Sequence, residues 1–455
     1  MSEDPGPART GMAEKGTPAP ARDRAPAIGL GVAVALMVLA MAVPAVTGWN
    51  VRINTFPPVH ADWLPRIGWT TPATLALAGV AGWQGHGLAL RLRWRTLLVT
   101  VFVAGLAWML ALALVDGRSG VAAILNDKYE YLNTARRTTD FGETLDIYVS
   151  KIGYQAEPDN WPVHIAGHPP GALLFFLVLV RIGLGSGLEA GLVVTGVAAT
   201  TAVAVLVTMR VLGAEELGRR AAPFLVFGPA AIWQSVSGDA VFAAVAAWGL
   251  AALAVAAVRR SITWSVVAGL LLGYCVMLSY GLTLLGFLAV AVLFLTRSWR
   301  PLPIAALAAL AVVLAFAVGG FTWWEGYSEV RARYFEGVGG RRPIGYWVWG
   351  SLAGLLFSAG PMLGAGVAML LANARRFVAD GATRVTAVLS GAGVVTILVA
   401  DASLMSKAEV ERIWLPFIPW LLLSCAFLPE RWRHTGLVVQ LGFALVVMHL
   451  LKTTW

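Results

Sequence analysis

Charged residues are scarce in this sequence. Only 13% of its 455 residues are Asp, Glu, Lys or Arg, whereas 58% are apolar. Soluble domains carry about 25% charged residues, so a soluble globular protein is excluded. The apolar residues form long continuous runs rather than the short alternating segments of a membrane β-barrel. We therefore expect an all-α polytopic membrane protein with about 12 to 14 transmembrane helices of about 20 residues each.

Cysteine is rare as well. The two cysteines, Cys275 and Cys425, both lie inside apolar runs. Their spacing matches neither a metal site nor a disulfide framework, so we expect small residues that face lipid or the protein core. The sequence also lacks a repeat with a period of about 20 to 50 residues, which excludes a repeat array.

The basic residues outnumber the acidic ones and give a formal net charge of +9, which could indicate a nucleic-acid partner. Most of them instead lie between apolar runs, where the positive-inside rule places cytoplasmic loops. The clearest such loop contains Arg91, Arg93 and Arg95. Three more loops are marked by Arg219 with Arg220, Arg259 with Arg260, and Arg297 with Arg300. The expected partner is therefore the lipid bilayer of the plasma membrane and not nucleic acid.

The chain divides into two parts. Residues 1–26 are rich in Pro, Gly and Ala and have no apolar face, which predicts a disordered cytoplasmic tail. Residues 27–455 form the predicted transmembrane domain. The positions of the basic loops require that one apolar segment between residues 172 and 212 does not cross the membrane. The shortest candidate is 172–184, about 20 Å of helix, where we expect a partial or re-entrant helix.

Three polar segments lie on the outer side under this assignment: residues 116–171, 324–345 and 401–412. The first segment holds 8 of the 25 acidic residues. Because the apolar runs are nearly free of charge, ionisable chemistry is expected in these outer segments. We therefore place the active site on the extracytoplasmic side.

The first segment holds the candidate catalytic residues. Asp127 and Glu130 are three residues apart, which on a helix places both on one face. A carboxylate there can take a proton from an attacking hydroxyl or hold a divalent cation, although a solvated surface helix is the alternative. His164 and His168 precede a Pro-Pro pair, whose restricted backbone suits binding of a phosphate or a sugar hydroxyl. Capping of the next helix is the alternative for the histidines.

The other two segments hold further candidate substrate-binding residues. Basic residues are unexpected on the outer side, and paired guanidiniums suit a phosphate group. The candidates in the second segment are Arg331, Arg333, Arg341 and Arg342. The candidates in the third are Lys407, Glu409, Glu411 and Arg412. Arg412 could anchor a lipid phosphate or be an ordinary snorkelling arginine, and the aromatic residues around the second segment fit an interfacial belt or a sugar-stacking surface.

Three short motifs resemble those of a known family. They are DKYEYL at residues 127–132, GHPPG at residues 167–171 and KAEVERIWLPF at residues 407–417, with Asp239 between two apolar runs. Together they resemble the GT-C membrane glycosyltransferases, in the branch that contains protein mannosyltransferases and aminoarabinose transferases. More narrowly, the pattern is similar to actinobacterial cell-envelope enzymes of the methylthioxylose transferase type, which modify lipoarabinomannan.

The resemblance implies transfer of a pentose or hexose from a polyprenyl-phosphate donor to a cell-envelope glycan or lipoglycan, with inversion. In that family an acidic residue of the first outer loop acts as the base, which by motif is Asp127 or Glu130. Basic outer residues bind the donor, and the motifs carry this role to His168 and Arg412. The family's acidic doublet is absent here, because Lys128 follows Asp127. The choice of base therefore stays open. A requirement for a divalent cation as cofactor is a separate open question.

If the three outer segments build one site, the carboxylates of Asp127 and Glu130 share a cavity with His168 and Arg412. The alternative function is a multi-pass transporter or flippase of lipid-linked sugars. Transporters tend to carry ionisable or broken helices at the bilayer midplane and an internal repeat. Here the charges avoid the apolar runs and gather in the outer segments, which favours the transferase.

Overall fold

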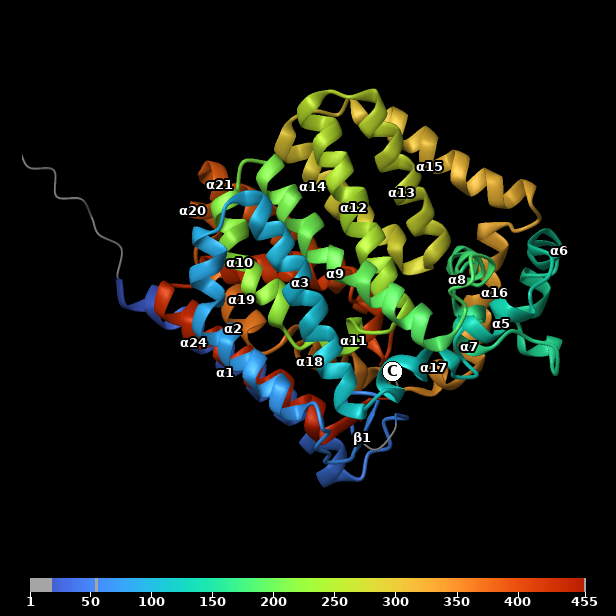
Figure 1. The fold of residues 1–455 in the computed structure, drawn as a ribbon, viewed down its shortest axis with the longest axis horizontal. Coiled ribbons are helices and arrows are strands. Elements are labelled where there is room, and N and C mark those ends of the chain that lie inside the picture. Colours follow the sequence, from blue (N-terminus) through green and yellow to red (C-terminus); the bar gives the residue numbers. More distant parts are fainter. Residues whose placement is uncertain (1–18, 54–55, 454–455) are drawn as a thin grey trace, which may run out of the picture.

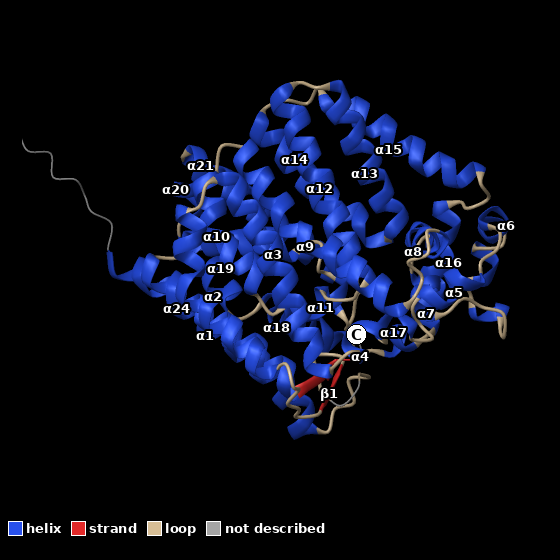
Figure 2. Ribbon diagram, in the orientation of Figure 1, coloured by secondary structure: helices blue, strands red, loops and turns tan. Residues whose placement is uncertain are grey.

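The computed structural model describes residues 19–53 and 56–453. Figure 2 shows helices throughout this part of the chain and one small pair of strands. Residues 1–18 of the predicted tail lie outside the described residues, and the first helix, α1, begins at Ala19, inside the range expected to be tail. The chain is an all-α polytopic membrane protein.

Seven of the described helices are long and apolar enough to cross a membrane. Each runs for at least 18 residues, close to the length that the hydrocarbon layer requires. They are α1 (Ala19–Thr47), α3 (Trp94–Ala113), α9 (Gly187–Val211), α12 (Gly238–Arg259), α15 (Pro301–Val318), α21 (Gly381–Ala402) and α24 (Glu430–Leu450).

Two more helices, α18 (Ile344–Ala359) and α19 (Met362–Ala372), form a span that is bent by 108°. The bend falls at Pro361, where the sequence predicts a break because proline lacks a backbone N–H. Gly360 adopts a left-handed φ of 85° there. The side chain of Gln440 on α24 satisfies the broken backbone, since its amide donates to the Ala359 carbonyl at 2.8 Å and its oxygen accepts from the Met362 N–H at 3.3 Å.

The remaining helices of the bundle are shorter or less apolar. They are α2 (Thr71–Arg91), α8 (Gly171–Arg181), α10 (Glu215–Phe227), α11 (Ala230–Gln234), α13 (Ile262–Leu278), η5 (Tyr280–Leu284), α14 (Leu285–Thr296), α20 (Ala374–Ala379), α23 (Ile418–Leu422) and η6 (Leu423–Phe427). The expected 12 to 14 helices counted each apolar run as one straight span. The structure breaks several of these runs, as at Pro229 between α10 and α11.

The α8 helix does not cross the bundle. It has 11 residues, and both of its ends lie beside the first polar segment. At its C-terminal end Arg181 donates to the Thr138 carbonyl at 3.3 Å, and in the following turn the Gly185 carbonyl accepts from Arg136 Nε at 2.9 Å. The helix is therefore too short for a full crossing and stays beside the first polar segment, as the basic loops require.

The polar segments fold into short helices at one end of the bundle. The first contains η1 (Leu114–Asp116), α4 (Ser119–Ala122), η2 (Ile124–Asn126), α5 (Tyr131–Arg137), α6 (Phe141–Asp146), η3 (Val149–Lys151), η4 (Tyr154–Ala156) and α7 (Val163–Gly167). The second contains α16 (Trp323–Glu336) and α17 (Val338–Arg341), and the third contains α22 (Val410–Ile413).

The two strands join parts of the chain that are far apart in the sequence. The β1 strand (Ala61–Trp63) pairs antiparallel with β2 (Leu451–Thr453), so that Asp62 lies opposite Lys452. Arg66, just after β1, forms an ion pair with Asp116 at the start of the first polar segment. This sheet therefore holds the loop after α1 against the same end of the bundle.

The basic loops gather at the other end. Arg219 on α10 donates to the carbonyl of Leu92, in the turn between α2 and α3, at 2.9 Å. In Figure 1 this turn and the turn between α12 and α13 lie far from α5, α7 and β1. The loops expected to be cytoplasmic are thus separated from the outer polar segments by the length of the bundle.

We expect a cysteine at position 143 to react with an impermeant thiol reagent added outside intact cells, and a cysteine at position 93 not to react. Glu143 and Arg93 are both exposed, and they lie in the first polar segment and in the α2–α3 turn. The background would carry Ala at Cys275 and Cys425, and both positions should react once the membrane is permeabilised. Labelling of position 93 alone in intact cells would reverse the orientation.

Candidate functional site

Three buried charges from distant parts of the chain meet where the first polar segment touches the bundle. Glu130 precedes α5, Asp239 lies in the first turn of α12, and Arg412 lies on α22. Their exposed fractions are only 5%, 6% and 5%. Arg412 Nη1 lies 3.5 Å from Glu130 Oε1, and Arg412 Nε lies 3.1 Å from Asp239 Oδ2. One guanidinium therefore lies between two carboxylates.

Burial alone would raise the pKa of Glu130. His164 and Arg412 outweigh this effect and hold the pKa of the carboxyl below its ordinary value. For Arg412, burial lowers the pKa, but the negative charges of Asp239, Glu130 and Glu409 raise it by more. The pKa of Arg412 is therefore above its ordinary value. Glu130 and Arg412 are consequently both charged at neutral pH, and each stabilises the charge of the other.

His164 joins this cluster through both ring nitrogens. Its Nε2 lies 3.2 Å from Arg412 Nη2, and its Nδ1 lies 2.9 Å from Glu130 Oε1. Because a guanidinium can only donate, Nε2 of the imidazole is the acceptor. The ring proton of this tautomer is therefore on Nδ1 and faces the carboxylate of Glu130.

A second histidine lies behind the first. His168 Nδ1 is 2.7 Å from the His164 carbonyl and 2.9 Å from the Tyr131 hydroxyl. Since a carbonyl only accepts, the ring proton of His168 is on Nδ1 and its Nε2 carries a lone pair. Burial lowers the pKa of His168, so the ring is neutral at neutral pH. Tyr148 fixes the backbone here by donating to the carbonyls of Ile165 and His168 at 2.9 and 3.1 Å.

The chain just before Asp239 is strained. Val236 has a φ of 57°, a left-handed conformation that is unfavourable for a β-branched residue by roughly 1 to 2 kcal/mol. Its N–H donates to Thr195 Oγ1 on α9 at 3.3 Å, and Ser237 then caps α12 by accepting from the Asp239 N–H at 3.2 Å. The tight turn carries the chain from α11 into α12 and directs Asp239 toward Arg412.

Further charges lie next to this cluster. Arg342 Nη2 lies 3.0 Å from Glu409 Oε1, and His60 Nδ1 lies 3.9 Å from the same oxygen. The His60 N–H donates to Glu411 Oε1 at 3.0 Å, and Lys407 Nζ donates to the Arg342 carbonyl at 3.3 Å. The loop after α1, the second segment and the third segment therefore converge here.

The two glutamates of this group differ in their ionisation. Burial raises the pKa of Glu409, but Arg342, Arg412 and His60 lower it to about 2. Burial raises the pKa of Glu411 to about 7, against the lowering effect of the His60 N–H. Glu411 is fully buried, and its Oε2 has no hydrogen-bond partner among the described residues. Glu409 is therefore ionised at neutral pH, whereas Glu411 is close to half protonated.

The wild type should lose stability as pH rises from about 4.5 to about 7. The Glu411→Gln variant should not show this loss. In this window the folded protein binds the Glu411 proton more tightly than the unfolded chain, so the free energy of unfolding falls with pH. At about 1.4 kcal/mol per pKa unit, the effect reaches about 3 kcal/mol. Thermal unfolding of the two purified proteins at pH 5.5 and pH 8 covers about 2 kcal/mol of this effect, because about 1.5 pKa units of the window lie above pH 5.5.

Burial lowers the pKa of His60 and of His168, and these groups oppose Glu411 below pH 6.5. The informative quantity is therefore the difference in the free energy of unfolding between the wild type and the Glu411→Gln variant at each pH. The histidine contributions are present in both proteins and cancel in this difference. An identical pH dependence in the two proteins would contradict the raised pKa of Glu411.

Asp127 lies outside the buried cluster. It is exposed, and its Oδ1 accepts from the Tyr129 N–H at 2.9 Å in an Asx turn. The Glu130 N–H donates to the Asp127 carbonyl at 3.1 Å, and α5 begins only at Tyr131. The expectation that Asp127 and Glu130 lie on one face of a helix is therefore wrong, because the Asx turn takes the place of the first helical turn.

The four arginines of the second segment do not act as one group. Arg331 and Arg341 are exposed, and Arg331 lies over the Phe335 ring at 5.5 Å. Arg333 is half-buried and donates to the carbonyls of Ile152 and Trp161 in the first segment. Only Arg342 is buried among the charges near Arg412.

Two side chains of the site were not among the candidates from the sequence. His60 lies in the loop after α1 and contacts the third segment, while Asp239 was noted only as an acidic residue between apolar runs. A carboxylate at the end of a spanning helix is costly unless it is paired, and this was the available signal for Asp239.

The described residues contain no group of three or more His, Cys, Asp or Glu side chains placed to hold a metal ion. The carboxylates of the site instead contact arginine and histidine. These residues therefore do not fit the divalent cation considered from the sequence, and no step below depends on one.

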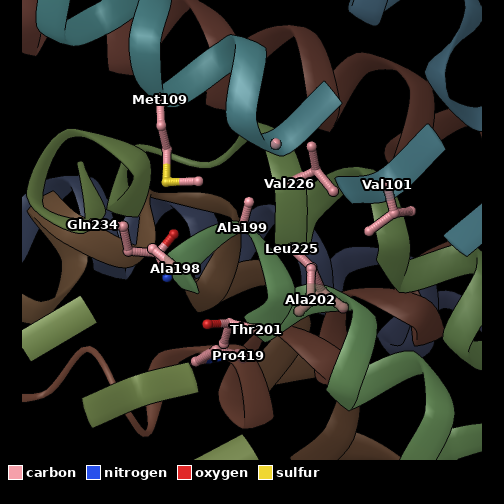
Figure 3. A pocket seen from close by; sticks show the side chains of 11 residues that line it. Val101, Met109, Ala198, Ala199, Thr201, Ala202, Leu225, Val226, Gln234 and Pro419 are labelled. Atoms are coloured by element: carbon pink, nitrogen blue, oxygen red, sulfur yellow. The ribbon is translucent and has the colours of Figure 1, made fainter. Parts of the chain in front are cut away.

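A small internal cavity lies within the bundle beside Pro419 (Figure 3). Its volume is about 20 Å³, which is enough for one water molecule but far below the roughly 300 to 1,000 Å³ of a ligand pocket. Thr201 and Gln234 provide polar groups at its wall. It is therefore a candidate site for a structural water and not for a substrate.

No protein-family model and no curated protein matches the sequence. The crystal structure of ArnT from Cupriavidus metallidurans in the apo state is similar to this chain at 17% sequence identity, over 69% of this chain and 73% of that chain. The TM-score is 0.28, which is too low to support an argument about a common fold.

Proposed function

We propose that this chain is a membrane glycosyltransferase of the GT-C type. It transfers a sugar from a polyprenyl-phosphate donor to an acceptor hydroxyl on the extracytoplasmic side of the membrane. The observation that carries this proposal is the buried Glu130–Arg412–Asp239 cluster with His164, at the end of the bundle opposite the basic loops. Burying charges is costly, and groups with perturbed pKa values cluster at functional sites.

Glu130 is the proposed general base. Its carboxylate is ionised at neutral pH, and it is backed by the guanidinium of Arg412 and the Nδ1–H of His164. Arg412 and the Nδ1–H of His164 both approach Oε1 of the Glu130 carboxylate. The other oxygen, Oε2, has no hydrogen-bond partner among the described residues, so it is the proposed atom that accepts the proton. An acceptor hydroxyl that reaches this oxygen would be oriented for attack.

Cations near the cluster are the proposed binding groups for the donor phosphate. Arg342 pairs with Glu409, Arg412 is close enough to lower the pKa of the same carboxyl, and Lys407 donates to the Arg342 carbonyl. As the donor breaks down, its leaving phosphate gains negative charge, which guanidinium groups stabilise through paired hydrogen bonds. These residues, from the second and third polar segments, complete the proposed site.

The proposed reaction is a single displacement. The acceptor oxygen forms a bond to the anomeric carbon, the bond from that carbon to the phosphate oxygen breaks, and the acceptor proton moves to Glu130. The products are the glycosylated acceptor and polyprenyl phosphate, and the anomeric configuration inverts. We further propose a pentose or hexose as the sugar and a cell-envelope glycan or lipoglycan at the plasma membrane as the acceptor, on the resemblance to methylthioxylose transferases.

The donor can be tested in membranes that contain the protein. Transfer to envelope glycans should require a polyprenyl-phosphate sugar, and it should stop with the nucleotide sugar alone once synthesis of the lipid intermediate is blocked. Adding the synthetic lipid-linked donor should restore it. The measurement is the incorporation of labelled sugar, with membranes that lack the protein as the control.

Undiminished transfer under that block would assign a nucleotide-sugar donor and overturn the proposal. The transporter alternative predicts a different result: the lipid-linked sugar would move across sealed vesicles, and no new glycosidic bond would form. Detection of a glycosylated acceptor by mass spectrometry separates the two functions.

A further inference from the structure

A groove of about 330 Å³ runs along α12 between α9 and α13. Its floor is α12, which packs against both neighbouring helices, and all of its lining residues are Val, Ala, Leu or Trp. The volume falls within the roughly 300 to 1,000 Å³ typical of ligand pockets, whereas the cavity beside Pro419 holds about 20 Å³. The groove is therefore large enough for a molecule other than water.

The groove begins at Ala244, five residues after Asp239, and extends toward the end of α12 that is opposite the charged site. Asp239 marks the site end of α12, and Val255 lines the groove 16 residues later, which is roughly 24 Å along the helix. The hydrocarbon layer is about 30 Å thick, so Val255 is close to the opposite membrane surface. A ligand whose polar end lies beside Val255 would therefore belong to the leaflet opposite the proposed donor.

The groove is also where α12 faces the surroundings of the bundle. Most of this helix is buried, but Trp248 is 36% exposed and Val245 is half-buried. Trp264 on α13, at the far end of the groove, is 40% exposed. Trp248 is held in place because its indole N–H donates to Thr200 Oγ1 on α9 at 3.0 Å. At this depth the surroundings are hydrocarbon, so the groove suits an apolar chain.

A positive charge ends the groove. The lining residues Ala244, Trp248, Ala251 and Val255 recur every three or four residues on one face of α12, and Arg259 continues that face one turn later. Arg259 is exposed and forms no ion pair within the described residues. A side chain of this kind at the membrane surface binds phosphate well.

We propose that this groove binds one acyl chain of an anionic glycerophospholipid, with the lipid phosphate at Arg259. The apolar lining provides for the chain, and the arginine at its end selects a negative headgroup over a neutral one. The site is independent of the proposed transferase site, which lies at the other end of α12. The bound phospholipid would be a structural lipid that stays with the helix bundle in that leaflet.

Native mass spectrometry of the purified full chain, incubated with phosphatidylglycerol or phosphatidylcholine in detergent, tests the proposal. The wild type should retain one phosphatidylglycerol in preference to phosphatidylcholine. Arg259→Gln should weaken retention of phosphatidylglycerol by about fivefold, the order expected for one basic residue near an anionic headgroup. Arg300→Gln, which removes an exposed arginine at the α14–α15 turn, is the matched control and should retain the lipid as the wild type does.

Ala252→Phe should fill the groove and reduce retention of both lipids. Thermal unfolding checks that this variant is folded. If it is not folded, the surface variant Arg259→Gln alone tests whether the groove binds the anionic lipid. Equal retention of the two lipids by the wild type would overturn the proposal. So would an Arg300→Gln variant that loses as much phosphatidylglycerol as Arg259→Gln, because binding would then follow net charge alone.

Discussion

Replacement of Glu130 by Gln is expected to lower the initial rate of sugar transfer by about 10² to 10⁴, the usual contribution of a general base. Gln keeps the size of the side chain and can still accept a hydrogen bond from Arg412, but it cannot take a proton at neutral pH. The substitution also leaves His164 without its anionic partner. The measurement is the initial rate in membranes matched for the amount of protein.

Asp127→Asn is the matched control for this prediction. Asp127 is exposed, and Asn can accept the same hydrogen bond from the Tyr129 N–H, so the turn should persist. We expect a rate within a fewfold of the wild type. If Asp127→Asn caused the large loss and Glu130→Gln did not, the roles of the two carboxylates would be the reverse of those proposed. Near-normal rates in both variants would remove the loop's carboxylates from the chemistry.

Arg412→Gln is expected to be the most destabilising single substitution in the site, by about 3 to 5 kcal/mol. The change removes the cation between Glu130 and Asp239, which are both buried, and leaves two carboxylates with too little opposing charge. Stability can be measured by thermal unfolding of the purified protein in detergent. Arg331→Gln, at an exposed position, should change it by no more than about 0.5 kcal/mol.

A double-mutant cycle separates the pairing from a general loss of packing. Asp239→Asn should destabilise the wild type markedly but change the Arg412→Gln protein far less, since the charge that it opposes is already gone. Additive effects of the two substitutions would contradict the ion pair between Arg412 and Asp239. This cycle measures stability and does not depend on the proposed activity.

Much of the fold could be predicted from the sequence because the bilayer imposes strict rules. Apolar runs predicted the spanning helices, and Pro361 predicted the break in one of them. The positions of the basic loops predicted that the segment of α8 is not a full crossing. The number of straight spans could not be predicted in the same way. Whether a run continues through a residue such as Pro229 depends on side chains like Gln440, which satisfy a broken backbone from another helix.

The site could be predicted only in part. His164, His168 and Arg412 were candidates, and the structure brings them together with Glu130. Asp127 is set apart by an Asx turn, which depends on a local hydrogen bond rather than on spacing. Among the arginines of the second segment only Arg342 is buried with the site, and a count of charges cannot tell which side chain turns inward. His60 and Asp239 required the tertiary contacts themselves.

The origin of the site in distant parts of the chain has a consequence for biosynthesis. Glu130 is made 282 residues before Arg412 (412 − 130), and β1 is made long before its partner strand at residues 451–453. At about 5 to 20 residues per second, the ribosome needs roughly 14 to 56 s to cover that interval. Glu130 is without its guanidinium throughout this interval, and Asp239 is without it from the moment it is made. Nascent chains stalled before residue 412 should therefore be prime substrates for membrane proteases, whereas chains released after β2 should escape them.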